Sequence, residues 1–170
     1  MPIHFTALAL AAAAFSLMAL AGCDAQRISE LQPGVSTEAD VRDRFGNPEA
    51  IWEEADGART FEYNRQPAGQ VNYMITVGAD GRLVAVRQVL TPGNFARITP
   101  GMDMAQVRRS LGKPAKVTSY WLSGETHHDW RFAEPPNIPM LFTVVTRDGS
   151  TVLRTQIGPD MEAPDNKGGR

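Results

Sequence analysis

Cysteine is nearly absent from this sequence. The chain of 170 residues contains one, Cys23, so it can form neither an internal disulfide nor a metal site built from several thiolates. Basic residues are not in excess, since 17 Lys and Arg stand against 19 Asp and Glu, which gives a formal net charge of −2. A nucleic-acid-binding surface needs concentrated positive charge, and we therefore do not expect nucleic acid as a partner.

The sequence motifs of common enzyme sites are also missing. No glycine-rich phosphate loop, nucleophile elbow or zinc motif occurs. The one grouping of catalytic residue types is His127-His128-Asp129. Neighbouring side chains of a strand point to opposite faces, so the two histidines cannot hold one metal ion without a bulge. We expect no catalytic residue, metal, cofactor or small-molecule substrate, and a metal-binding or hydrolytic protein that uses these three residues is the alternative.

The long uncharged apolar run of this chain lies at its amino terminus. Residues 5–21 are small or apolar, and the run ends in Leu20-Ala21-Gly22-Cys23. A run of this length with small residues before a defined end predicts a secretory signal peptide, residues 1–22. The last four residues resemble the lipobox of bacterial lipoproteins, which implies that Cys23 is lipidated and becomes the first residue of the mature protein. The alternative is a soluble secreted protein in which Cys23 has no such role.

The lipobox resemblance also implies a location. A lipoprotein that carries several acyl chains, palmitate among them, would be held stably at the periplasmic face of the envelope. Asp24 follows the cysteine, and in enteric bacteria an Asp there tends to retain lipoproteins in the inner membrane. We expect the outer membrane, and the inner membrane stays open because of Asp24.

A pattern that occurs twice organises the rest of the chain. Residues 31–48 read LQPGVSTEADVRDRFGNP, and residues 98–114 read ITPGMDMAQVRRSLGKP. The shared positions are Pro33, Gly34, Val41, Gly46 and Pro48 in the first copy and Pro100, Gly101, Val107, Gly112 and Pro114 in the second. The spacing is 67 residues at Pro-Gly and 66 from the valine onward. We interpret this as an internal duplication of one structural unit.

Each copy contains the signals of one short helix, over residues 37–46 and 103–112. Thr37 and Asp103 are good N-caps, and a residue able to complete a capping box follows each of them after three positions. Gly46 and Gly112 occupy the place of a left-handed C-terminal cap. Helices of about two turns are unstable in isolation, so each is expected to pack on a sheet.

Four antiparallel strands are expected after each helix, joined in part by Asp-Gly turns. They are residues 50–53, 59–64, 71–77 and 83–89 in the first copy and 116–122, 128–133, 141–145 and 151–157 in the second. Residues 134–139 contain three prolines and are expected to form a loop or a blunted edge. The predicted fold is α+β, with two tandem modules that each pack a short helix or helix pair on a three- to four-stranded antiparallel sheet.

These signals divide the chain into five segments. They are the signal peptide 1–22, a polar tether 23–27, the first module 28–92, the second module 93–158 and a disordered tail 159–170.

The duplicated motif, the later Asp-Gly hairpins and the lipobox together resemble the BamE (SmpA/OmlA) family of small bacterial lipoproteins. The resemblance covers roughly residues 28–158. It implies an accessory subunit of the machine that inserts β-barrels into the outer membrane. The presence of two modules is also similar to β-lactamase inhibitory protein, whose paired units present a concave face to an enzyme. Both resemblances imply an adaptor that binds envelope proteins and catalyses nothing, and the alternative to barrel assembly is an inhibitor-like or stress-related envelope lipoprotein.

Aromatic residues gather on the first hairpin of each module. In the second module Tyr120 and Trp121 are adjacent, so both cannot face the core from a regular strand. Exposed Trp and Tyr beside an Arg are typical of the residues that dominate binding energy at protein interfaces. We predict that one of these aromatic residues, together with Arg131, contacts a partner.

Overall fold

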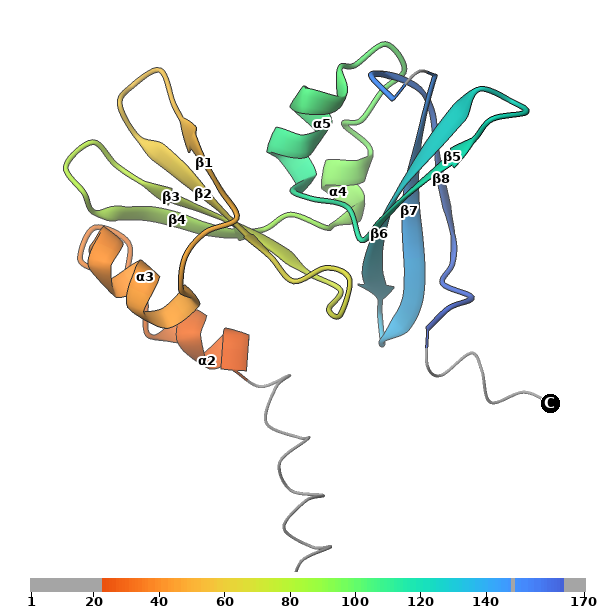
Figure 1. Cartoon of the computed structure of the whole chain (residues 1–170). Helices are drawn as coiled ribbons and strands as arrows, with labels where there is room; N and C mark the ends of the chain where they lie inside the picture. Colours follow the sequence, from red (N-terminus) through yellow and green to blue (C-terminus); the bar gives the residue numbers. More distant parts are fainter. Residues whose placement is uncertain (1–22, 148, 164–170) are drawn as a thin grey trace, which may run out of the picture.

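The computed structural model describes residues 23–147 and 149–163 of the chain. The predicted signal peptide, residues 1–22, and the last part of the predicted tail, residues 164–170, lie outside the described residues. Two four-stranded antiparallel sheets, each accompanied by short helices, make up the fold (Figure 1). The predicted α+β class with two tandem modules is confirmed. Within the described ranges, no helix combines the length and the apolar character that crossing a membrane requires.

The second module repeats the element order of the first. The first module consists of α2 (Cys23–Ser29), α3 (Glu38–Phe45), β1 (Ala50–Glu53), β2 (Arg59–Asn64), β3 (Asn72–Val77) and β4 (Leu83–Gln88). The second consists of α4 (Pro92–Phe95), α5 (Met104–Leu111), β5 (Lys116–Tyr120), β6 (Glu125–Glu134), β7 (Ile138–Arg147) and β8 (Thr151–Pro159). Strands that follow one another in sequence are hydrogen-bonded neighbours in both sheets.

Helices α3 and α5 have equivalent ends. Thr37 and Asp103 are their N-caps, and both helices have a complete capping box. Gly46 and Gly112 end them with φ of 78° and 76° and ψ of −156° and −172°. This combination differs from a left-handed helix and is open essentially to glycine alone. The two predicted helices are confirmed, and their caps require glycine more strictly than the predicted left-handed conformation does.

The Pro-Gly turn before each helix is bonded to the last hairpin of its own module. The N–H of Gly34 donates to the carbonyl of Leu83 at 2.8 Å, and the N–H of Gly101 donates to the carbonyl of Val152 at the same distance. The two glycines have φ of 77° and 89°, which explains why both copies have glycine at this position.

The carbonyl of each cap glycine accepts a hydrogen bond from an aromatic side chain of the second strand. The hydroxyl of Tyr63 donates to Gly46, and the indole N–H of Trp130 donates to Gly112, both at 3.0 Å. Tyr63 and Trp130 are therefore equivalent positions of the repeat, 67 residues apart. This equivalence relates the strands of the two sheets residue by residue.

The modules stack in layers. Helices α2 and α3 cover one face of the first sheet, and α4 and α5 lie between the two sheets (Figure 1). The first core consists of Leu31, Val41, Phe45, Phe61, Tyr63, Tyr73, Ile75, Val77 and Leu83. The second core, which includes Val107, Leu111, Trp130, Phe132 and Phe142, also takes in Met74 from β3. The first sheet is thus covered on parts of both faces, whereas α4 and α5 cover one face of the second.

The residues predicted to form a polar tether are helical in the structure. Residues 23–27 belong to α2, and the carboxylate of Asp24 accepts hydrogen bonds from Arg65 at 2.9 and 3.1 Å. This pair fixes the helix to the loop after β2, because both side chains are largely withdrawn from solvent. Polar composition alone indicated a tether, and the partner that orders it lies 41 residues away.

Two predictions about the second module are wrong in their extent. Strands β6 and β7 include residues 134, 138 and 139 of the predicted loop, which leaves a turn of residues 135–137. Proline is tolerated near the start of a strand, where Pro139 lies. The predicted tail begins at residue 159, yet Pro159 belongs to β8, and the side chains of Asp160 and Ala163 are buried.

Candidate functional site

His128 faces the core of the second module. It is 9% exposed, and its Nε2 lies 3.3 Å from Oγ1 of Thr146. Burial lowers the pKa of His128, because the charged imidazolium would lose its hydration. The sequence placed this residue at a strand start, but β6 begins at Glu125, so His128 lies inside the strand.

His127 and Asp129 lie on the opposite, outer face of β6, as the alternation of a strand predicts. Nε2 of His127 is 3.4 Å from Oε2 of Glu125, and the hydroxyl of Thr143 donates to Asp129 at 2.6 Å. No group of three His, Cys, Asp or Glu residues within 23–147 and 149–163 is placed to hold a metal ion. The grouping that suggested metal or hydrolytic chemistry is therefore split between two faces of one strand.

Polar residues on the outer face of the second sheet form an ordered network. Arg154 on β8 donates to both carboxylate oxygens of Glu125, at 2.6 and 3.0 Å. This guanidinium, with help from His127, holds the pKa of Glu125 at about 2. The pair lies beside the β5–β6 turn and gives that end of the sheet a defined polar surface.

The β5–β6 hairpin ends in three consecutive exposed hydrophobic residues. Tyr120 is the last residue of β5, and Trp121 and Leu122 follow in the turn. They are 47%, 85% and 81% exposed. We call these three residues the hairpin tip. The sequence predicted one exposed aromatic residue here, and the structure exposes both because the strand ends between them.

The backbone of the hairpin tip is held by contacts at its base. The ring of Tyr120 packs on the ring of His127, with centroids 4.6 Å apart. The hydroxyl of Ser123 donates to the carbonyl of Tyr120 at 3.3 Å, and Gly124 supplies the positive φ of the turn, 67°. Trp121 and Leu122 are therefore presented by an ordered hairpin.

Arg131 does not join the hairpin tip. It lies six residues from the start of β6, which corresponds to about 20 Å along the strand. Its Nε is 3.1 Å from Oδ2 of Asp160, and its guanidinium donates to the carbonyl of Pro67 at 3.1 Å. The predicted partner-binding set is thus split between two places on the second sheet.

Sequence reasoning missed Leu122, although an aromatic-apolar run directly before a Ser-Gly turn is a usable signal.

The part of the first sheet that α5 leaves uncovered forms a shallow hollow of about 670 Å³. It is lined by Glu54, Ala55, Asp56, Ala58, Thr60, Thr76, Val84, Ala85 and Arg87. At its border the guanidinium of Arg109 lies 5.2 Å from the ring centroid of Trp52. Among the described residues, the buried Nε1 of Trp52 has no hydrogen-bond partner.

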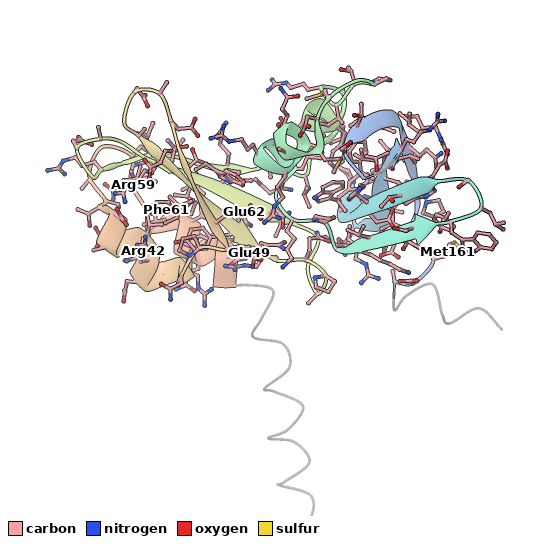
Figure 2. The ribbon with its side chains drawn as sticks, turned by 45° about the horizontal axis from the view of Figure 1, so that its top comes forward. Arg42, Glu49, Arg59, Phe61, Glu62 and Met161 are labelled. Atoms are coloured by element: carbon pink, nitrogen blue, oxygen red, sulfur yellow. The ribbon has the colours of Figure 1, made fainter. Side chains whose placement is uncertain are left out.

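Buried polar contacts join the two modules beside this hollow. The carboxylate of Glu62, fully buried, accepts two hydrogen bonds from Arg108 at 3.1 and 3.3 Å and one from the N–H of Lys113 at 2.9 Å. The amide of Asn72 donates to the carbonyls of Leu111 and Lys113 at 2.8 and 3.2 Å. We call this set the junction. Figure 2 labels Glu62 and Glu49 near it, and Arg42, Arg59 and Phe61 on the helix side of the first sheet.

The junction was not predicted from the sequence. A usable signal is the uninterrupted run Tyr73-Met74-Ile75, because a strand without polar alternation is typical of a sheet covered on both faces. The junction fixes how the hollow of the first sheet is oriented toward the second module, since it bonds α5 and the residues after it to β2 and β3.

Comparison with known proteins does not assign a family. No family model matches the chain, and no curated protein matches it. Two solved structures are similar in fold. One is YjgB, a DUF4309 family protein from Bacillus subtilis, with 19% identity over 76% of this chain and 82% of that chain and a TM-score of 0.30. The other is a "putative beta-lactamase inhibitor protein" from Streptococcus mutans, with 8% identity over 76% of this chain and 91% of that chain and a TM-score of 0.33.

These two likenesses are low in identity and TM-score, and no functional conclusion follows from them. The resemblance to the BamE family is not shown, and the role in barrel assembly has no support from the comparisons.

Proposed function

We propose that this chain is an inhibitor-like envelope lipoprotein that binds another protein through its hairpin tip. The observation on which the proposal depends is the exposure of Trp121 and Leu122, 85% and 81%, on an ordered hairpin. Trp is among the residues that most often dominate the energy of protein interfaces, and it does so when a partner's pocket removes it from water.

The hairpin tip suits insertion into a pocket. A two-stranded ribbon with a Trp and a Leu at its end presents large apolar area on a narrow support. Contiguous exposed apolar residues typically mark sites of interaction with proteins or membranes. The polar pair of Glu125 and Arg154 at the base of the tip supplies the charged rim that surrounds the apolar centre of an interface.

The position of the tip favours a protein over the membrane of the proposed lipid anchor. Helix α2, which begins at Cys23, and the β5–β6 turn lie at opposite ends of the molecule (Figure 1). A chain attached to a bilayer at Cys23 would present its hairpin tip away from that bilayer. A partner in the periplasmic space can reach it there.

The test of this function is capture of a partner by the purified mature protein from detergent-solubilised envelopes. Trp121→Ala is expected to reduce capture by roughly 25-fold or more, since a dominant interface residue contributes about 2 kcal/mol. Its melting temperature should not change, because the side chain has few contacts to lose. Val35→Ala, which alters an exposed apolar residue of the first module at 61% exposure, is the matched control and should leave capture intact. Equal capture by Trp121→Ala and the unaltered protein would contradict the proposal.

We also propose lipidation at Cys23 as the means of attachment. Cys23→Ser is expected to move the protein from the membrane fraction to the soluble fraction, because the acyl chains supply the membrane affinity. Fractionation followed by immunoblotting measures this. A variant that stays with the membranes after a high-salt wash would show that another contact holds it there.

A further inference from the structure

A cleft of about 510 Å³ lies on the outer face of the second sheet, at the end away from the hairpin tip. Its walls are formed by Pro67, Ala115, Lys116, Asp129, Arg131, Leu141 and residues 159–162. Figure 2 labels Met161, whose side chain is 71% exposed at the cleft. Lys116 lies four positions before Tyr120 on β5, or about 13 Å along the strand, so the cleft and the hairpin tip are different surfaces.

The repeat relates this cleft to the junction of the first module. Tyr63 and Trp130 are equivalent positions of the repeat. Glu62 directly precedes Tyr63 and Asp129 directly precedes Trp130, so Glu62 and Asp129 are equivalent as well. Glu62 is fully buried, since α5 and Lys113 of the following module cover that face. Among the described residues, no third module covers the second sheet in the same way, and Asp129 lines the cleft. The cleft is therefore the second copy of a surface that in the first copy already binds a protein segment.

Charge distinguishes the two copies. The residue opposite Glu62 in the register is Ala50, and the residue opposite Asp129 is Lys116. Two positions further along the strand, Asn64 of the first copy corresponds to Arg131. The second copy has thus acquired two cations at places where the first has neither. A surface with this pair of cations fits carboxylates.

Carboxylates of the segment that follows β8 form ion pairs with both cations. Oε1 of Glu162 lies 2.8 Å from Nζ of Lys116, and Oδ2 of Asp160 lies 3.1 Å from Nε of Arg131. Glu162 also lies 3.5 Å from the guanidinium of Arg131. We call residues 160–162 the strap. The strap is an acidic segment with an apolar residue between its two carboxylates, and it lies directly after the edge strand β8.

We propose that the sheet side of this cleft, which carries Lys116 and Arg131, binds an acidic segment of a partner protein, and that the strap, which forms the opposite wall, pairs with the same cations in the free protein as a competing internal ligand. The pair of Lys116 and Glu162 has side chains 54% and 59% exposed. Ion pairs with that exposure contribute little net stability, so a segment from another protein can replace this contact first. The carboxylate of Asp160 at Arg131 is 2% exposed and holds the strap more firmly. Without the strap, the cleft retains Lys116 and Arg131 against Asp129, whose carboxylate is engaged by Thr143.

The proposal goes beyond the hairpin tip, and its test does not use the tip. The probe is an end-blocked synthetic peptide of residues 158–163, titrated into the isotope-labelled mature protein and followed by NMR. The variant Asp160→Asn/Glu162→Gln weakens the strap and should bind the peptide. The unaltered protein should bind it about tenfold more weakly if the strap pairs with Lys116 and Arg131 nine-tenths of the time. Shifts are expected at Lys116, Asp129 and Leu141.

Three controls give each outcome a meaning. A peptide with Asn and Gln in place of its Asp and Glu should not bind, and Lys116→Ala in the strap variant should weaken binding of the acidic peptide. Trp121→Ala should leave peptide binding unchanged, so failure here is separable from failure of the tip. Glu162→Gln alone alters a side chain that is 59% exposed, and it serves if the double variant does not fold. Equal binding of the neutral peptide, or no binding of the acidic peptide to either strap variant, would overturn the proposal.

Discussion

Gly46 and Gly112 end equivalent helices in different surroundings. A methyl group added at Gly46 would meet no described atom within 4 Å. The same group at Gly112 would lie 2.9 Å from Nδ2 of Asn72 and 3.4 Å from Oε1 of Glu62. Both glycines have positive φ, so backbone strain applies to both positions and crowding to Gly112 alone.

This difference predicts the order of two alanine variants. Gly46→Ala is expected to lower the free energy of unfolding by about 1 kcal/mol or more through backbone strain. Gly112→Ala should lower it further, because the new methyl group displaces the amide of Asn72 from its hydrogen bonds. Urea denaturation of both variants measures the two losses. Equal losses would contradict the contact assigned to Asn72, and unchanged stability in both would contradict the cap conformations.

His128 predicts how stability depends on pH. Burial lowers its pKa in the folded protein below the ordinary value of 6.5. In the interval between the two pKa values the unfolded chain binds a proton that the folded protein does not, so stability falls as the pH drops from 7 toward 5. Above the ordinary pKa this contribution to stability is fully present.

The first module supplies the matched variant for this effect. Phe61 is the equivalent of His128, two residues before Tyr63 and Trp130. His128→Phe is expected to flatten the decrease in urea midpoint between pH 7 and pH 5, while Thr146 still donates to the carbonyl of Thr126 at 3.2 Å. An identical pH dependence in the variant and the unaltered protein would show that another group is responsible.

At the scale of elements, local signals predicted α3 and α5 well. Thr37, Asp103 and the two cap glycines act on neighbouring backbone groups, so their effect is readable from a short stretch of sequence. The strands of the first sheet were predicted within one residue of their observed ends, because Asp-Gly turns and alternation delimit them. Each of these elements carries its own boundary signals.

The elements that were mispredicted depend on distant partners. Strands β6 and β7 pair over ten residue pairs, from Glu125 with Arg147 to Glu134 with Ile138, and this pairing extends them beyond the composition that suggested a loop. The tether is helical where Asp24 meets Arg65, and the strap is ordered where it meets Lys116 and Arg131. None of these contacts leaves a local pattern in the sequence.

The candidate sites were predictable to the same limited degree. Alternation indicated exposure at Tyr120 or Trp121, and the structure adds Leu122 and removes Arg131 from the hairpin tip. The equivalence of the cleft and the junction becomes visible only when β2 and β6 are compared as copies. Sequence alone aligned the helices, whereas the hydrogen bonds of Tyr63 and Trp130 align the strands.

At the scale of the whole molecule, one mode of packing is used twice. The first sheet binds the end of α5 through Glu62 and Asn72, and the second sheet offers an equivalent surface that the strap occupies. The hairpin tip lies at the other end of the second sheet, far from α2 (Figure 1). The arrangement leaves two surfaces for protein contacts, one apolar and one that fits carboxylates.

Site-specific photocrosslinking in living cells tests most directly whether the hairpin tip binds a protein. A photoreactive phenylalanine derivative placed at Trp121 is compared with the same derivative at Val35, which is 61% exposed in the first module. An adduct with a protein is expected at the tip position and none at the control position. Adducts with lipid alone at position 121, or no adduct there, would contradict the claim that the hairpin tip binds a protein.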